Sequence, residues 1–201
     1  MYAFQRLQQK VFDLSITAWE AYTKTLDPLP LAWLRTVRRQ PGDTCTVDAS
    51  GVRLSRRRFA AATMAFASYM KLDPQVQNVG ILLPAANAAA IANMAVMLRG
   101  RTVVNLNFSA PPAAVRAAIV QAGIRQVFTS RQFQEKLDAK GVDLPAMLQD
   151  VQIMYMEDIR VQVPQWLLLA NLVQASLFPG QLLYWMHGRR RGLEDAAAIL
   201  F

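Results

Sequence analysis

Residues 78–130 read NVGILLPAANAAAIANMAVMLRGRTVVNLNFSAPPAAVRAAIVQAGIRQVFTS, and this stretch decides the fold class. It contains three short apolar runs, NVGILLP, TVVNLN and QVFTS, separated by two segments of helical composition, 87–98 and 109–121. Short apolar strands that alternate with helices of ten or more residues are typical of a parallel sheet covered by helices. We therefore predict an α/β fold with a mostly parallel sheet flanked by helices.

The residues at the ends of these segments agree with that prediction. Gly100 and Gly123 follow the two helical segments, where helices commonly end in a left-handed residue. Asn87 is the predicted N-cap of the first helix, and Ser109 before two prolines begins the second. Two further runs, VQIMYM at 151–156 and AAAILF at 196–201, are predicted as the fourth and fifth strands.

The first 72 residues predict a helix, a hairpin and another helix. Residues 2–26 form an amphipathic pattern with one apolar stripe, and we favour docking of this helix onto its own domain over a partner or a membrane helix. A Gly-containing turn at 49–51 predicts a β-hairpin, and Ser55 caps a helix that runs to about residue 72. We divide the chain into an N-terminal helical segment, 1–40, and a domain, 41–201. The stripe consists of Phe4, Leu7, Val11, Leu14 and Ala18.

Composition sets the limits of this interpretation. With 201 residues, 53% of them hydrophobic, the chain can bury a core. Its net charge of +8 comes mainly from arginine runs at 35–39, 53–58 and 189–191, which suit an anionic lipid surface, nucleic acid or a solvated face. No nucleic-acid-binding motif accompanies them, so we expect no nucleic-acid partner. The single cysteine, Cys45, excludes an internal disulfide and favours a reducing compartment.

Residues 163–186 carry no formal charge and are numerous enough to span a bilayer. Pro179-Gly180 interrupts the segment and amide side chains punctuate it, so we favour a buried or interfacial helix pair over a transmembrane span. Aromatic side chains beside an arginine run suit a membrane interface. The candidate membrane-contact residues are Trp166, Tyr184, Trp185, Arg189, Arg190 and Arg191.

Motifs for catalysis are missing from the sequence. Neither G-x-x-x-x-G-K-[ST] nor G-x-G-x-x-G occurs, so the chain has no Gly-rich loop to hold a phosphate. His187 is the only histidine, and it has neither a nucleophile nor an aspartate at the spacing of an acyltransferase motif. We therefore predict no catalytic, cofactor-binding or metal-binding residues in this chain.

Residues 79–133 nevertheless resemble the early part of the adenylate-forming (AMP-binding) superfamily. The resemblance rests on Leu83-Pro84 at a strand end, on Leu98-Arg99-Gly100 at a helix end, and on the Asn-Leu stretch 104–108. Phe128–Phe133 and Tyr155–Asp158 are most similar to one branch, the bacterial 2-acylglycerophosphoethanolamine acyltransferase/acyl-ACP synthetases. The resemblance covers about residues 44–201.

This resemblance implies ATP-dependent activation of a fatty acid as an acyl-adenylate, with transfer to the thiol of acyl carrier protein, and lysophospholipid acylation. In the superfamily, a strand like Ala198–Phe201 runs directly into the ATP-phosphate loop, and this sequence ends one residue before that loop would start. We therefore expect a fragment that is inactive alone, while ATP and Mg²⁺ bind in the intact family. It is expected in the cytoplasm or on the cytoplasmic side of the inner membrane, with possible self-association. The alternative is a non-enzymatic membrane-surface or partner-binding module.

Overall fold

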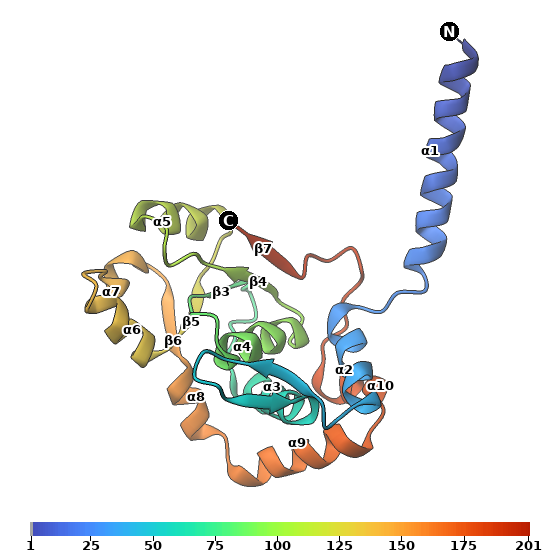
Figure 1. Cartoon of the computed structure of the whole chain (residues 1–201). Helices are drawn as coiled ribbons and strands as arrows, with labels where there is room; N and C mark the ends of the chain where they lie inside the picture. The colour runs from blue at the N-terminus through green and yellow to red at the C-terminus, as the bar shows by residue number, and fades with distance from the viewer. Residues whose placement is uncertain (1) are drawn as a thin grey trace.

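The structure, a computed structural model, describes residues 2–201 (Figure 1). One sheet contains β3 (Asn78–Ile81), β4 (Thr102–Asn105), β5 (Gln126–Thr129), β6 (Gln152–Tyr155) and β7 (Ala198–Leu200). A separate hairpin contains β1 (Thr44–Val47) and β2 (Arg53–Ser55). The helices are α1 (Tyr2–Thr23), α2 (Leu29–Arg39), α3 (Arg56–Tyr69), α4 (Asn87–Leu98), α5 (Pro112–Gln121), α6 (Arg131–Asp138), α7 (Leu144–Met147), α8 (Met156–Gln162), α9 (Gln165–Leu177) and α10 (Gly180–His187).

The five-stranded sheet is parallel throughout, in the order β6-β5-β3-β4-β7. The α/β prediction is therefore confirmed, together with the predicted fourth and fifth strands. β7 pairs with β4 so that Val104 lies opposite Ile199 and Asn105 opposite Leu200. Parallel neighbours need long crossover connections, and the helices between the strands supply them.

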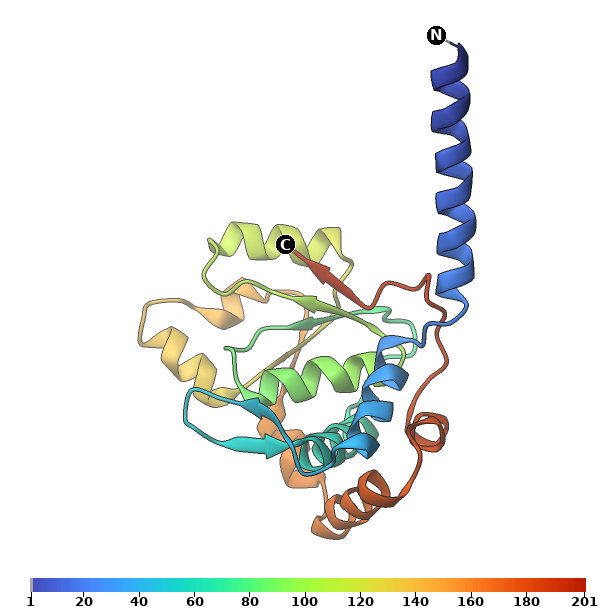
Figure 2. The ribbon, with the colours of Figure 1, turned by 45° about the vertical axis from the view of Figure 1, so that its right-hand side comes forward.

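Helices cover both faces of the sheet and make a three-layer architecture (Figure 2). Successive side chains of a strand point to opposite faces. Val79 and Ile81 accordingly belong to the core shared with α2, α3, α4, α9 and α10. Leu82 belongs to the second core, with α5, α6 and α7. Burial on both faces explains why the strands are continuous apolar runs without polar alternation.

At Gly80, side chains of the second core lie very close to the backbone of β3. A Cβ atom on this residue would lie 2.8 Å from Cγ2 of Val127, 3.2 Å from Cγ2 of Ile124 and 3.3 Å from Cδ1 of Leu106. The second core is therefore packed directly against the backbone of the central strand.

The ends of the helices follow the predicted chemistry, with one correction. Gly100 has φ +69°, and the Gly100 and Arg101 N–H groups donate to the carbonyls of Met97 and Val96, which is a Schellman end. Asn87, however, is the first residue of α4 and not its N-cap. Its side-chain amide donates to Asp48 Oδ2 at 3.1 Å and to the Val52 carbonyl at 3.0 Å, so it ties α4 to the hairpin turn.

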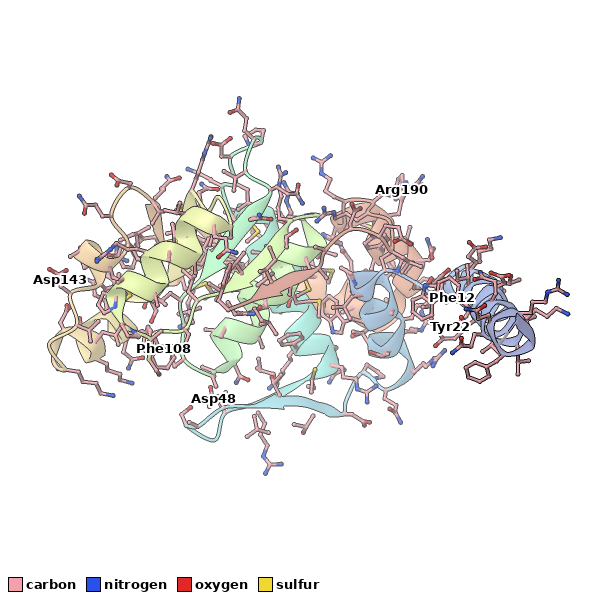
Figure 3. The ribbon with its side chains drawn as sticks, turned by 90° about the horizontal axis from the view of Figure 1, so that it is seen from above. Phe12, Tyr22, Asp48, Phe108, Asp143 and Arg190 are labelled. Atoms are coloured by element: carbon pink, nitrogen blue, oxygen red, sulfur yellow. The ribbon has the colours of Figure 1, made fainter. Side chains whose placement is uncertain are left out.

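Helix α1 stands apart from the body, and its apolar side chains are exposed (Figure 1). Figure 3 shows Phe12 and Tyr22 on this helix, to one side of the sheet. Docking of the 2–26 helix onto its own domain was therefore the wrong expectation. Leu34 and Val37 of α2, in contrast, are fully buried in the first core. The packing thus changes between α1 and α2.

Residues 163–186 form two helices, α9 and α10, that meet at Pro179. Both contact the α2–α3 side of the molecule through the first core, where Ala175 and Leu183 are buried. Among residues 2–201, no helix combines the length and hydrophobicity needed to cross a membrane. The predicted helix pair is therefore confirmed.

Candidate functional site

The candidate site lies at the carboxyl ends of the strands, where the connections after neighbouring strands cross to opposite faces of the sheet. After β3 the chain enters α4, which packs in the first core, whereas after β4 it enters α5, which packs in the second. In open parallel sheets, ligands bind outside the carboxyl ends of strands at such a switch point. We call this edge, formed by the residues that follow β3, β4, β5, β6 and β7, the carboxyl edge.

Strand β7 brings the last residues of the chain to the carboxyl edge. Its parallel pairing with β4 means that Leu200 lies beside Asn105, the last residue of β4. The Asn105 side-chain amide donates to Asn93 Oδ1 of α4 at 3.0 Å, which fixes this end of β4 against the helix. Backbone that follows β7 would therefore leave the sheet next to the switch point, where backbone N–H groups can bind an anion.

The carboxyl edge is closed on the α5–α6 side by an aromatic contact. Phe108, which follows β4, packs edge-on against Phe133 of α6, with ring centroids 5.0 Å apart. Phe133 is buried in the second core, and Phe108 is partly buried beside it. This pair holds the 104–108 stretch in place where β4 becomes a loop.

Arg131 and Asp158 form the principal ion pair of the carboxyl edge. Arg131 begins α6 after β5, and Asp158 lies in the first turn of α8 after β6. The guanidinium donates to both carboxylate oxygens, at 2.6 and 2.9 Å, which is the bidentate geometry of strong pairs. Glu157 Oε1 also accepts the Arg131 backbone N–H at 3.0 Å.

An aromatic ring completes this cluster. The Arg131 guanidinium carbon lies 4.2 Å from the centroid of the Tyr155 ring, a cation–π distance. The Tyr155 hydroxyl donates to Gln134 Oε1 at 2.7 Å. These contacts join the ends of β5 and β6 through the two motifs, 128–133 and 155–158, that carried the branch-level resemblance.

The electrostatics of the cluster favour a fixed ion pair over proton transfer. The hydrogen bond from Arg131 lowers the pKa of the Asp158 carboxyl, and the bond to Asp158 raises the pKa of Arg131. Both groups therefore stay charged at neutral pH. A general acid or base needs a pKa near the working pH, so this pair is suited to positioning and not to acid–base catalysis.

The predicted membrane-contact residues divide into two groups. Trp166 and Trp185 are 66% and 71% exposed, and Arg189 and Arg190 are exposed beside α10, with Arg190 at the periphery in Figure 3. Tyr184 is only 7% exposed, because its ring packs in the first core, so the expected surface contact is wrong for this side chain.

Arg191 belongs to the second group, because it is half-buried. Its Nε lies 3.4 Å from Asp195 Oδ2, and its Nη1 donates to Thr102 Oγ1 at 3.3 Å. This side chain is therefore engaged within the fold and is not a free surface cation.

The remaining candidate side chains are not grouped together. Cys45 is an exposed residue of β1. Its thiol is nevertheless partly desolvated, and this raises the pKa of the thiol. His187 Nε2 lies 2.8 Å from Gln174 Oε1, joining α10 to α9, and burial lowers its pKa. Within residues 2–201 no cluster of three or more His, Cys, Asp or Glu side chains has the geometry to hold a metal ion.

Comparison with known proteins identifies the family. The family model described as AMP-binding enzyme matches residues 33–179, most of the chain. The chain belongs to the AMP-binding enzyme family. The match begins in α2 and ends at Pro179, so it includes β3 to β6 and the Arg131–Asp158 pair but not α1 or β7.

Solved structures support the same fold for this member of the AMP-binding enzyme family. It resembles the Klebsiella oxytoca NpsA N-terminal subdomain in complex with 3-hydroxybenzoyl-AMSN, with a TM-score of 0.58 and 17% identity, over 72% of this chain and 34% of that one. It also resembles VinN, with a TM-score of 0.60 and 15% identity, over 85% of this chain and 41% of VinN. The chain therefore spans between a third and a half of these relatives.

Sequence reasoning did not find the Arg131–Asp158 pair. The two residues are 27 positions apart, and each looked like an ordinary residue of a helix start. The signal that could have found them was their place, one just after β5 and the other three residues after β6, since carboxyl ends of adjacent parallel strands meet at one edge.

Proposed function

We propose that this chain forms the sheet-bearing part of an ATP-dependent fatty acid:acyl carrier protein ligase of the acyl-ACP synthetase/2-acylglycerophosphoethanolamine acyltransferase branch. In this reaction a fatty-acid carboxylate attacks the α-phosphorus of ATP and forms an acyl-adenylate with release of pyrophosphate. The carrier thiol then attacks the acyl carbon and releases AMP. Within this scheme ATP and Mg²⁺ are held by residues outside this chain, and residues 2–201 position the sheet.

The position of β7 carries this proposal. β7 lies beside β4 with its carboxyl end at the switch point, so a phosphate-binding loop that followed Phe201 would start at the carboxyl edge. A glycine-rich loop there could direct backbone N–H groups at a nucleotide phosphate. Membership of the AMP-binding enzyme family supports this role for the sheet.

Two observations support a carboxylic acid as the substrate, and one favours a fatty acid. VinN has been solved with L-aspartate, and the NpsA subdomain with 3-hydroxybenzoyl-AMSN, so both relatives are associated with carboxylic acids or acyl groups. The motifs 128–133 and 155–158, which meet in the Arg131–Asp158 cluster, resemble the fatty-acid branch. We therefore favour a fatty acid over an amino acid.

Fatty-acid-dependent exchange of pyrophosphate into ATP tests the proposal. The protein encoded by the genomic reading frame that contains this chain should exchange with fatty acids and transfer the acyl group to carrier protein. Residues 1–201 alone should not exchange and should not bind ATP with micromolar affinity, because they contain no Gly-rich, lysine-containing loop. Exchange that depends on amino acids, or micromolar ATP binding by residues 1–201, would contradict the proposal.

We also propose that the protein works on the cytoplasmic face of the inner membrane as a peripheral protein, where phospholipids are available. The exposed rings of Trp166 and Trp185 lie on helices next to the arginine run, a combination that suits a lipid–water interface. This location requires no membrane-spanning segment within the chain, because interfacial helices bind through one face.

A further inference from the structure

Three arginines surround a cavity at the opposite end of the sheet from the candidate site. The cavity has a volume of about 420 Å³. Its walls come from the residues that precede β3, β4 and β7, so it lies at the amino edge of the sheet. We call it the arginine cavity; it is lined by Leu72, Pro74, Arg99, Gly100, Arg101 and Arg189.

A glycine at the end of α4 allows these arginines to come together. Gly100 has φ +69°, a left-handed conformation that side chains rarely adopt. A Cβ atom here would lie 2.8 Å from Cβ of Arg189, so any other residue would force the two segments apart. The Arg189 backbone N–H also donates to the Leu98 carbonyl at 2.8 Å, which joins the 189–191 run to the end of α4.

The side chains of Tyr184 and Arg191 also fix the backbone of the 189–191 run. The buried Tyr184 hydroxyl donates to the Arg189 carbonyl at 2.9 Å. Arg191 is bound to Thr102 and paired with Asp195. Arg189 therefore has its backbone fixed on both sides, while its side chain is exposed at the cavity.

The charge in the cavity is not balanced by carboxylates. Within residues 2–201 the side-chain ion pairs involve Arg35, Arg56, Arg131 and Arg191, and none of the three cavity arginines. Arg101 donates to the Pro74 carbonyl at 3.1 Å, a neutral acceptor. Burial, followed by the proximity of Arg189 and Arg101, lowers the pKa of Arg99.

Capping of α4 does not account for this arrangement. Cations are favourable near a helix C-terminus, but the helix dipole there is equivalent to only about half a negative charge. Three guanidinium groups exceed that charge several-fold and repel one another. An anion in the cavity would offset this repulsion and accept hydrogen bonds from the guanidinium groups.

We propose that Arg99, Arg101 and Arg189 form a binding site for a phosphate group. The guanidinium fork matches phosphate oxygens bidentately, and several forks around one centre suit a tetrahedral dianion. Leu72 and Pro74 line the same cavity, so it offers an apolar wall beside the cations. This combination fits a phosphomonoester, whose organic part would lie against the apolar wall.

Titration of the 201-residue chain with inorganic phosphate tests the site. Calorimetry against chloride of equal ionic strength should show specific binding. Arg101→Gln and Arg189→Gln should each weaken it about tenfold or more, since a hydrogen bond to a charged group is worth at least that factor. Arg190→Gln is the matched control, because it removes one positive charge from an exposed neighbour that does not line the cavity.

Two further arms identify the source of the phosphate. Glycerol 3-phosphate should compete with inorganic phosphate if the ligand is soluble. Vesicles with phosphatidic acid in phosphatidylcholine should bind with the same sensitivity to Arg101→Gln if it is a lipid headgroup. Circular dichroism should confirm that the variants fold, and Arg101→Lys, which retains the charge without the fork, should weaken binding less than Arg101→Gln. Absence of phosphate binding, or equal losses for Arg190→Gln and Arg101→Gln, would overturn the proposal.

Discussion

Gly80 illustrates how one residue determines the packing of the sheet. The added methyl group of Gly80→Ala would lie 2.8 Å from Cγ2 of Val127, which belongs to a stiff β-branched side chain in the adjacent strand. Overpacking of a filled core destabilises a protein by about 1–3 kcal/mol. We therefore expect Gly80→Ala to lower the free energy of unfolding by an amount in this range, measured by urea denaturation.

Gly42 provides the control for this prediction. It lies in the loop before β1, and a Cβ atom there would have no neighbour within 4 Å. Gly42→Ala should change the free energy of unfolding by less than about 0.5 kcal/mol, as is usual for surface substitutions. Equal effects at the two positions would mean that the second core does not pack against Gly80 as described.

The Arg131–Asp158 pair makes a prediction about pH. Arg131→Gln should raise the pKa of Asp158 toward the ordinary value of about 3.9, because the guanidinium bond that lowers it is lost. In the wild-type protein the lowered pKa of Asp158 means that the ionised carboxylate stabilises the fold at pH values above the ordinary pKa. This contribution is lost as the pH falls through the lowered pKa of the folded state.

Carboxyl ¹³C chemical shifts of Asp158, followed by NMR as a function of pH, measure this directly. Lys136→Gln is a suitable control, since it removes a positive charge from the same helix, α6, but from a residue outside the ion pair. An Asp158 pKa that is the same in the wild type and in Arg131→Gln would show that the pair does not persist in solution.

At the scale of elements, α9 and α10 present their tryptophans, Trp166 and Trp185, to solvent. We expect the protein to bind anionic vesicles, because each cation near such a surface contributes about 1 kcal/mol, screened over about 8 Å at physiological salt. The double substitution of Trp166→Ala and Trp185→Ala should weaken binding several-fold by removing the apolar contact. Vesicle sedimentation at low and high salt measures both contributions.

Val120→Ala is the comparison for these tryptophan substitutions. Val120 is also an exposed apolar residue, but it lies on α5, which covers the other face of the sheet. Binding should be unchanged in this variant. If the tryptophan variant binds as well as the wild type, α9 and α10 do not form the membrane contact.

Most elements could be predicted from the sequence, because each is encoded locally. The apolar runs before Pro84, after Gly100 and after Gly123 became strands within the expected limits. Glycines in the left-handed conformation marked the helix ends, because the local backbone geometry of a helix end requires a residue that tolerates a positive φ. The hairpin and the α9–α10 break depended in the same way on short-range turn and proline chemistry.

The incorrect expectations involved contacts between distant segments. Asn87 has a good N-cap side chain, yet Asp48 and the hairpin bind it instead. The stripe of α1 predicted burial, but no pattern within a helix specifies the surface that covers it. The arginine cavity likewise depends on Gly100 and Arg189, which are 89 positions apart in the sequence and come into contact only in the folded chain.

At the scale of the whole molecule, the carboxyl edge and the amino edge of the parallel sheet have different chemistry. Its carboxyl edge holds the fixed Arg131–Asp158 pair and receives β7. Its amino edge gathers three arginines around a cavity, and none of them forms an ion pair within residues 2–201. Both properties follow from strand order, because parallel neighbours place all strand starts at one end and all strand ends at the other.

The outer side of β7 leads to the last prediction, which is self-association. Among the strands of residues 2–201, β7 is an edge strand that pairs with β4 alone, so the backbone N–H and C=O groups on its other side face no strand of this part of the chain. Leu200 is 79% exposed. Such an edge is a template for pairing with another chain. Sedimentation velocity should detect concentration-dependent dimers, and Leu200→Lys should suppress them because lysine on an edge strand opposes pairing. Val161→Lys should not, since the exposed Val161 lies on α8, which follows β6 at the opposite side of the sheet. A monomer at high concentration would show that the β7 edge is not used in this way.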